Sequence, residues 1–274
     1  NPQLDEAIRY YTGALAVRPR NPAAYVNLGN ALRGKGDLAG AVSAFREATR
    51  YGGDYTAAYI RLEQTLRHAG APDEAIAEFK AAAQAQPEDA WAHRALGYAL
   101  IAKGLLDEAI PAFKHALRLE PAFAATRFGL GFALQRKGML DEAISEHREA
   151  VRLNPMNADH HRELGIALTD KRLLDEAIAE FREALRLDPG NADTRSWLGI
   201  ALGRKGLWDE AIAEFSKSLE QFPKDARYWN NRGGSYAELG QWKEALADFA
   251  KVSELKEDDP LPRYRQALAC IQLE

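Results

Sequence analysis

The chain has 274 residues, of which 28% are charged, and a net charge of −4, a composition typical of a folded protein in water. This slight acidic excess disfavours binding to nucleic acid or a membrane surface, and no apolar run approaches the roughly 18 residues of a membrane span. The single cysteine, Cys270, excludes an intramolecular disulfide and a cysteine metal cluster, so we expect a reducing, cytoplasmic compartment.

A period of 34 residues runs through the chain from its first predicted helix onward. An alanine marks each period, and a ring follows four residues later. Self-similarity at such a period is the signature of stacked repeats. The alanines are Ala7, Ala41, Ala75, Ala109, Ala143, Ala177, Ala211 and Ala245, and the rings are Tyr11, Phe45, Phe79, Phe113, His147, Phe181, Phe215 and Phe249.

Each period predicts two helices joined by a turn. The first helix carries a Leu-Gly pair, as at Leu96 and Gly97, and ends near a glycine that can adopt the positive φ of a helix C-terminus. The second helix opens with Leu-Asp-Glu-Ala-Ile, as at residues 174–178, and acids in the first turn complement the helix dipole. It ends before a proline such as Pro189, which cannot continue the helix.

In chain order, residues 1–21 match only the second helix of a repeat. Its apolar face lacks a partner helix, which predicts self-association and favours a segment cut from a longer parent. Residues 260–274 match a first helix and are expected to cap the array, with Cys270 as an inert buried thiol. Between them lie seven complete repeats: 22–55, 56–89, 90–123, 124–157, 158–191, 192–225 and 226–259.

This pattern resembles the tetratricopeptide repeat family over nearly the whole chain, and is similar to the near-uniform arrays of large bacterial proteins. The resemblance implies an all-α fold, a right-handed α-solenoid of antiparallel helix pairs whose first helices line a concave groove. Glu63 replaces a first-helix glycine, His147 replaces a second-helix ring, and Pro111 lies inside a predicted helix. We expect altered packing in the three repeats that contain these departures.

No motif predicts catalysis, a cofactor or a metal site. Residues 29–36 imitate a phosphate-binding loop, but Gly36 stands where Ser or Thr must reach magnesium and no strand precedes the loop. No two histidines have the i, i+4 spacing of a helical zinc pair. Asp-Glu pairs recur as helix starts in successive repeats, whereas a catalytic dyad would occur once. The sequence therefore predicts a protein without enzyme activity.

The candidate partner-binding residues lie on the first helices of repeats 2 to 4, at positions that face the groove in the family. Arginines and rings gather there, and no Asp or Glu occurs at these positions in repeats 1 to 4, whereas repeats 5 to 7 are mixed in charge. Arginine binds carboxylates with two hydrogen bonds and stacks on rings, which predicts a protein or peptide partner with apolar and acidic residues. The candidates are Arg61, Arg67, Trp91, Arg94, Tyr98, Phe128, Phe132 and Arg136.

The alternative interpretation is that the rings pack between neighbouring first helices and the arginines form a solvated face. If the rings contact the partner, Tyr98→Ala or Phe132→Ala should weaken binding about tenfold or more with little loss of stability. Two known binding modes of the family find no match. Only Asn30 fits the clamp for chaperone-tail carboxylates, and the asparagine ladder is interrupted after Asn27 by Arg61 and Ala95.

Three functions remain open at this point. The first is a protein-interaction scaffold that binds a peptide or partner segment in the concave groove. The second is a regulatory or sensor segment of a larger enzyme, because similar arrays are fused to bacterial signalling kinases and caspase-like proteases. The third is binding of single-stranded nucleic acid through Arg and stacked rings, which the net acidic charge disfavours.

Overall fold

The computed structural model describes residues 2–51, 56–70 and 72–255. Within these ranges the regular elements are α-helices and no strand occurs, so the predicted all-α solenoid of helix pairs is confirmed. The predicted capping helix at residues 260–274, with Cys270, lies outside the described residues.

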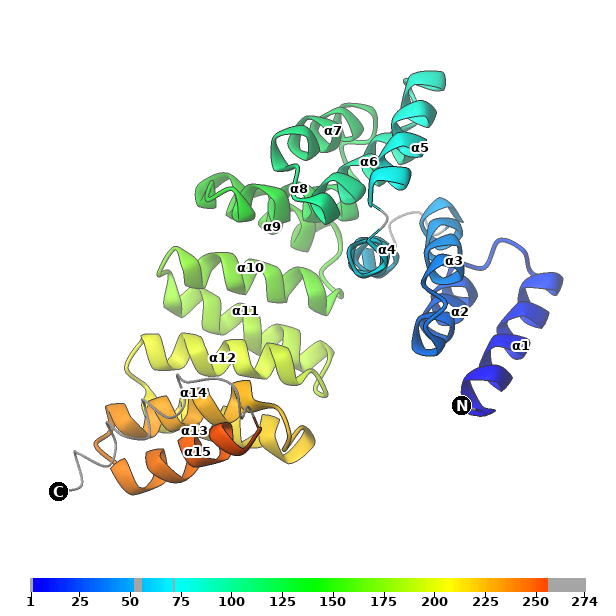
Figure 1. Ribbon diagram of the computed structural model, residues 1–274. Coiled ribbons are helices and arrows are strands. Elements are labelled where there is room, and N and C mark those ends of the chain that lie inside the picture. The colour runs from blue at the N-terminus through cyan, green and yellow to red at the C-terminus, as the bar shows by residue number, and fades with distance from the viewer. Residues whose placement is uncertain (1, 52–55, 71, 256–274) are drawn as a thin grey trace. The chain divides into compact units, whose positions relative to one another are not determined.

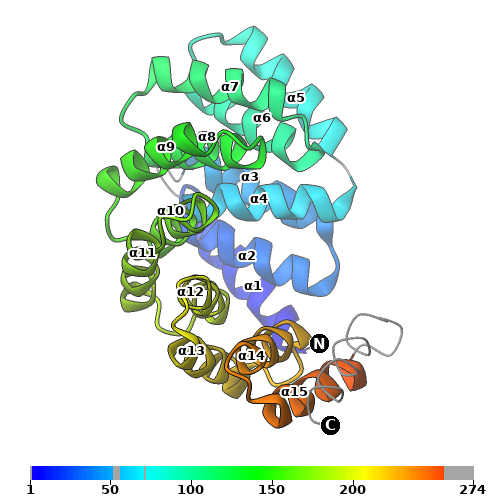
Figure 2. The same cartoon turned by 90° about the vertical axis from the view of Figure 1, so that its left-hand side faces the viewer.

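The chain divides into two compact units, Asn1–Pro155 and Met156–Glu274. Figures 1 and 2 show each unit as a stack of helices joined by short turns. The first unit contains α1 (Pro2–Val17), α2 (Pro22–Lys35), α3 (Leu38–Tyr51), α4 (Thr56–Ala69), α5 (Pro72–Ala85), α6 (Ala90–Lys103), α7 (Leu106–Leu119), α8 (Ala124–Arg136) and α9 (Leu140–Leu153). The second contains α10 (Ala158–Asp170), α11 (Leu174–Leu187), α12 (Ala192–Arg204), α13 (Trp208–Gln221), α14 (Ala226–Glu238) and α15 (Trp242–Leu255).

Helix α1 packs against α2 and buries Leu15. On its outer side Tyr10 and Val17 are 70% and 81% exposed. An exposed apolar stripe tends to find cover, so self-association through residues 1–21 stays a prediction.

Capping residues set where the first helix of each pair begins and ends. Before α2, α6, α10, α12 and α14 an Asn or Asp accepts a hydrogen bond from a first-turn amide, as Asp89 does from the Trp91 N–H at 3.0 Å, whereas Phe123 before α8 makes no such bond. The helix ends at a residue in the left-handed region, as at Gly104 with φ 84°, where a side chain would be strained. Arg172 takes this place after α10 with φ 62°, the single such residue other than glycine in the described ranges.

The core of each regular pair is built around a ring that packs against a helix backbone. Phe113 of α7 is fully buried between α6 and α8. A Cβ atom on Gly97 would lie 2.7 Å from Phe113 Cζ, and one on Gly129 would lie 2.6 Å from Cε1. Only glycine leaves room for the ring at this distance, which explains why a glycine and an aromatic residue recur together in the sequence.

The second repeat departs from this arrangement at Glu63. This residue stands on α4 at the position that Gly97 has on α6, where only a glycine leaves room for the ring of the second helix. Helix α4 does not close onto α5; it packs mainly against α3 and α6. The Phe79 ring of α5 packs edge-on against Trp91 instead, with ring centroids 5.6 Å apart. The altered packing expected from Glu63 is confirmed.

The other two departures leave their helix pairs intact. Helix α7 continues through Pro111, which lies near its start and is exposed to solvent. His147 is fully buried and takes the place of the ring, so that a Cβ atom on Gly131 would lie 2.8 Å from its Cε1. The expectation of altered packing was therefore wrong for these two residues.

Candidate functional site

Arg94 on α6 is an interior residue of the first unit, with 3% of its surface exposed. Its Nε donates to the Tyr59 hydroxyl at 2.7 Å, and its Nη1 donates to Thr126 Oγ1 at 3.2 Å and to Glu120 Oε2 at 3.0 Å. The guanidinium also covers the Phe123 ring at 3.6 Å from the centroid. The expectation that Arg94 offers a charge to a partner is corrected, because these contacts use its guanidinium to connect α4, α6 and α8.

Tyr98 and Phe128 are also interior residues, 2% and 3% exposed. Tyr98 stacks on Tyr59 with centroids 4.9 Å apart, and its hydroxyl donates to the Ala125 carbonyl oxygen at 2.7 Å. Phe128 packs edge-on against His147 at 5.9 Å. These two rings pack between helices, as the alternative interpretation expected. Truncating Tyr98 would therefore reduce stability, which corrects the expectation that this substitution leaves the fold almost unaffected.

Trp91 is half-buried at the start of α6. Its Nε1 donates to Thr49 Oγ1 on α3 at 3.2 Å, and the Arg50 guanidinium lies 5.9 Å from its ring. These contacts join α3 to α6 across the opened second repeat, by which we mean the repeat whose helices α4 and α5 do not pack closely on each other. Trp91 thus has a structural role, and only part of its ring is available to a partner.

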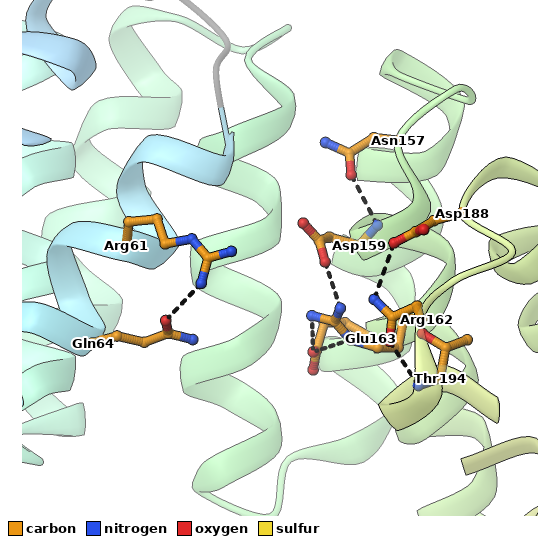
Figure 3. Close-up of polar contacts among 9 residues, drawn as sticks. Arg61, Gln64, Asn157, Asp159, Arg162, Glu163, Asp188 and Thr194 are labelled. Carbon is orange, nitrogen blue, oxygen red and sulfur yellow. Dashed lines mark hydrogen bonds and ion pairs between the residues drawn. The ribbon is translucent and has the colours of Figure 1, made fainter. Parts of the chain in front are cut away.

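The other four candidates are accessible and come from two helices that contact each other, α4 and α8. On α4, Arg61 is half-buried and donates to Gln64 Oε1 at 3.4 Å (Figure 3), whereas the Arg67 side chain is 55% exposed. On α8, Phe132 is half-buried and the exposed Arg136 lies 6.0 Å from its ring centroid. Arg61, Arg67, Phe132 and Arg136 define what we call the basic face.

Glu63 lies within this basic face but is only 7% exposed. Its Oε1 accepts no hydrogen bond from the described residues and lies 3.9 Å from Arg67 Nη1. Burial raises the pKa of the Glu63 carboxyl above its ordinary value, although the positive charges of Arg67, Arg136 and His68 act in the opposite direction. The buried carboxylate therefore destabilises the fold when it is ionised.

We expect the stability of the first unit to depend on pH through Glu63. A carboxyl whose pKa is raised in the folded state stabilises the fold at pH values below its unfolded-state pKa, which is near 4.5. This stabilisation is lost as the pH rises through the folded-state pKa. Glu63→Gln removes the titration and should flatten the decline. Urea unfolding of both chains between pH 4.5 and pH 8 measures this, and parallel pH profiles for the two chains would contradict it.

The charged residues on the first helices of the second unit largely neutralise one another. Arg162 on α10 binds both Asp159 and Glu163 (Figure 3). Burial raises the pKa of Glu163, and the neighbouring Arg162 partly opposes this shift. Arg227 of α14 pairs with Asp193 of α12 at 3.1 Å. Burial, followed by the charge of Asp193, raises the pKa of Tyr228 to about 12.

The second unit contains an open cavity of about 590 Å³ on α12 and α14, which we call the α12/α14 pocket. Gly203, Gly234 and other small residues line it together with the rings of Trp208 and Trp242. We did not predict this pocket from the sequence. A signal was present, because the residues that precede Gly234 at the 34-residue step are all larger: Asn30, Gln64, Tyr98, Phe132, Ile166 and Ile200.

The described residues also bear on metal binding and membrane insertion. Among residues 2–51, 56–70 and 72–255, no group of three or more His, Cys, Asp or Glu side chains could hold a metal ion. Over the same ranges, no helix is both long enough and apolar enough to cross a membrane.

Comparison with known proteins identifies the repeats. Models described as tetratricopeptide repeat or TPR repeat match residues 3–55, 66–110, 97–138, 128–192, 168–232 and 226–259. Curated protein sequences give no significant match.

Solved structures of the same kind align with the chain. YrrB, described as a TPR protein with an unusual peptide-binding site, is 26% identical with a TM-score of 0.58, over 69% of this chain and 97% of its own. MamA is 27% identical with a TM-score of 0.57, over 63% and 94%. The APC/C hetero-tetramer Cut9–Hcn1 is 17% identical with a TM-score of 0.69, covers 98% of this chain and 53% of its own, and supports the fold alone. The repeat models match segments between residues 3 and 259, and the helix pairs and the solved structures point to the same repeat. The chain therefore belongs to the tetratricopeptide repeat family.

Proposed function

We propose that the protein is a non-catalytic interaction scaffold that binds a segment of a partner protein on the first helices of its pairs. The family and the similarity to YrrB and MamA support a protein-interaction role. YrrB is described as having a peptide-binding site, and we extend peptide binding to this chain as part of the proposal.

The distribution of charge on α4, α6 and α8 carries the proposal. Glu63 is the only carboxylate in these three helices, and it is buried, whereas Arg67 and Arg136 are exposed. The chain as a whole is net acidic, so this surface differs from the rest of the molecule. Arginines beside the partly exposed Phe132 ring suit a segment that places apolar side chains next to carboxylates.

Reversing two charges of the basic face should abolish most of the binding. We expect peptides selected from a random 12-residue display library on the full chain to be rich in acidic and apolar residues. Arg61→Glu combined with Arg136→Glu should weaken the binding of these peptides by about tenfold or more, and by more in low salt than in high salt, since salt screens exposed charges. Fluorescence polarisation with labelled peptides measures the affinity.

Arg152→Glu is the matched control, because this arginine lies on the second helix α9 and its side chain is 66% exposed. It should leave the affinity unchanged. If the Arg152 variant loses binding while the double variant binds normally, the partner uses the outer surface of the second helices, and the proposal is wrong.

A further inference from the structure

The α12/α14 pocket exists because side chains are missing where other repeats have them. A Cβ atom on Gly234 would meet no other atom within 4 Å, so the space beside the α14 backbone is open. At the preceding 34-residue steps the corresponding residues are Ile166 and Ile200, and Ile200 itself lines the cavity. Ala237, three residues after Gly234, is the next small side chain along the same face and also lines the cavity.

Aromatic rings form the walls of the pocket. Trp208 lies directly against the α12 backbone, because a Cβ atom on Gly203 would come within 2.7 Å of its Cζ3. Trp242, which is half-buried, contributes further ring surface, whereas Phe215 and Phe249 lie almost fully buried beneath the cavity. Rings attract another ring in stacked or edge-to-face geometry and bury a large apolar area, so these walls favour an aromatic guest.

The polar groups of the pocket suit a peptide backbone. The Asn231 carboxamide lines the cavity and offers both a donor and an acceptor, which matches the N–H and C=O of an extended segment. Arg204 and Glu238 bring one charge of each sign. Arg204 is already engaged, since its Nη1 donates to the Thr169 carbonyl oxygen at 3.1 Å. Because the charges of Arg204 and Glu238 are opposite, the lining of the pocket has no net charge and suits a neutral side chain.

We propose that the α12/α14 pocket binds an aromatic side chain of an extended partner segment, with Asn231 holding the neighbouring backbone. This proposal rests on the proposed scaffold function and adds to it a second contact, on a different unit from the basic face and with a different chemistry. The basic face selects acidic segments, and the pocket selects a neutral ring.

Gly234→Leu tests the pocket without weakening the fold. The new side chain enters open space, and replacing a helical glycine adds helix propensity, so the variant should be at least as stable as the parent chain. The probe is N-acetyl-phenylalaninamide, which should bind the parent chain with a Kd of about 1 mM, as expected for so small a ligand. Binding should shift the indole N–H signals of Trp208 and Trp242 in nuclear magnetic resonance spectra.

The Gly234→Leu substitution should weaken probe binding by about tenfold or more, because the added side chain fills the space that the probe would occupy. Gly13→Leu on α1 is the matched control, because a Cβ atom there also meets nothing within 4 Å and Gly13 does not line the pocket. It should bind the probe like the parent chain. N-acetyl-alaninamide and N-acetyl-lysinamide should not bind.

Three results would overturn the proposal: no shift of the two indole signals, equal binding by the Gly234→Leu chain, or binding of the lysine probe as strong as that of the phenylalanine probe. The Arg61→Glu, Arg136→Glu chain should still bind the probe. If library peptides depend on the basic face and the probe fails, the scaffold function stands and the aromatic pocket does not.

Discussion

Phe181→Ala is expected to lower the free energy of unfolding by about 3–5 kcal/mol, the usual effect of removing a fully buried ring from a packed core. The Phe181 side chain has no exposed surface, and its Cε1 lies where a Cβ atom on Gly165 would come within 2.7 Å. Alanine would leave a cavity between α10 and α11 that the backbone cannot close without moving a helix. Urea unfolding of the full chain, followed by far-ultraviolet circular dichroism, measures the loss.

Phe222→Ala is the control, because this residue follows α13 as its C-cap and is 51% exposed. It should change the stability by no more than about 0.5 kcal/mol. Phe181→Ala should also leave peptide binding normal at temperatures where the chain stays folded. A loss of stability as small as that of the control would contradict the packing described for the rings and glycines.

Arg94→Ala is expected to destabilise the first unit by about 3 kcal/mol, because it removes a buried side chain together with the hydrogen bonds that this side chain donates to two buried hydroxyl groups. The Tyr59 and Thr126 hydroxyls both accept from this guanidinium. Arg94→Met keeps the apolar stem and should recover part of the loss, since the stem of a buried arginine packs like a hydrophobic side chain. Thermal and urea unfolding of the three chains measure the difference.

The matched control is Arg152→Ala, which removes an exposed arginine from the same unit. It should leave the stability almost unchanged, because an exposed ion pair contributes little. If Arg94→Ala were equally mild and reduced peptide binding in a salt-dependent way, Arg94 would be a partner contact after all.

The repeated features of the fold could be predicted from the sequence because each depends on contacts within one repeat or with its neighbour. The period placed the helices, and the spacing of Gly97 and Phe113 reflects a close approach that the structure contains. The left-handed end of α10 at Arg172 also falls where the glycine period has its gap. Short-range contacts of this kind repeat with the sequence.

The burial of Arg94, Tyr98 and Phe128 could not be predicted in the same way. Family geometry assigns these positions to an open face, but that geometry assumes a regular second repeat. In this chain α4, which carries Glu63 in place of the glycine, packs on α6 rather than on α5, and there Tyr59 stacks on Tyr98 and accepts a hydrogen bond from Arg94. The surroundings of Arg94 and Tyr98 thus depend on a helix more than thirty positions away, through contacts that no local pattern reveals.

The α12/α14 pocket was missed for a different reason. Charge and aromatic content directed attention to repeats 2 to 4, whereas the pocket arises from what Gly203 and Gly234 lack. The residues spaced 34 apart from Asn30 to Gly234 are all larger than glycine except the last, and this exception marks the position in the sequence alone.

The opened second repeat also affects how such a gene can change in length. Repeat genes gain and lose whole copies by unequal recombination, and a copy is exchangeable when its two helices pair with each other. Residues 56–89 do not meet this condition, because α4 is tied to α3 and α6 rather than to α5. Deleting this copy would remove Tyr59, which accepts a hydrogen bond from Arg94. Duplicating it would bury a second carboxylate like that of Glu63. Copy number is therefore expected to vary among the regular pairs and to stay fixed at this one.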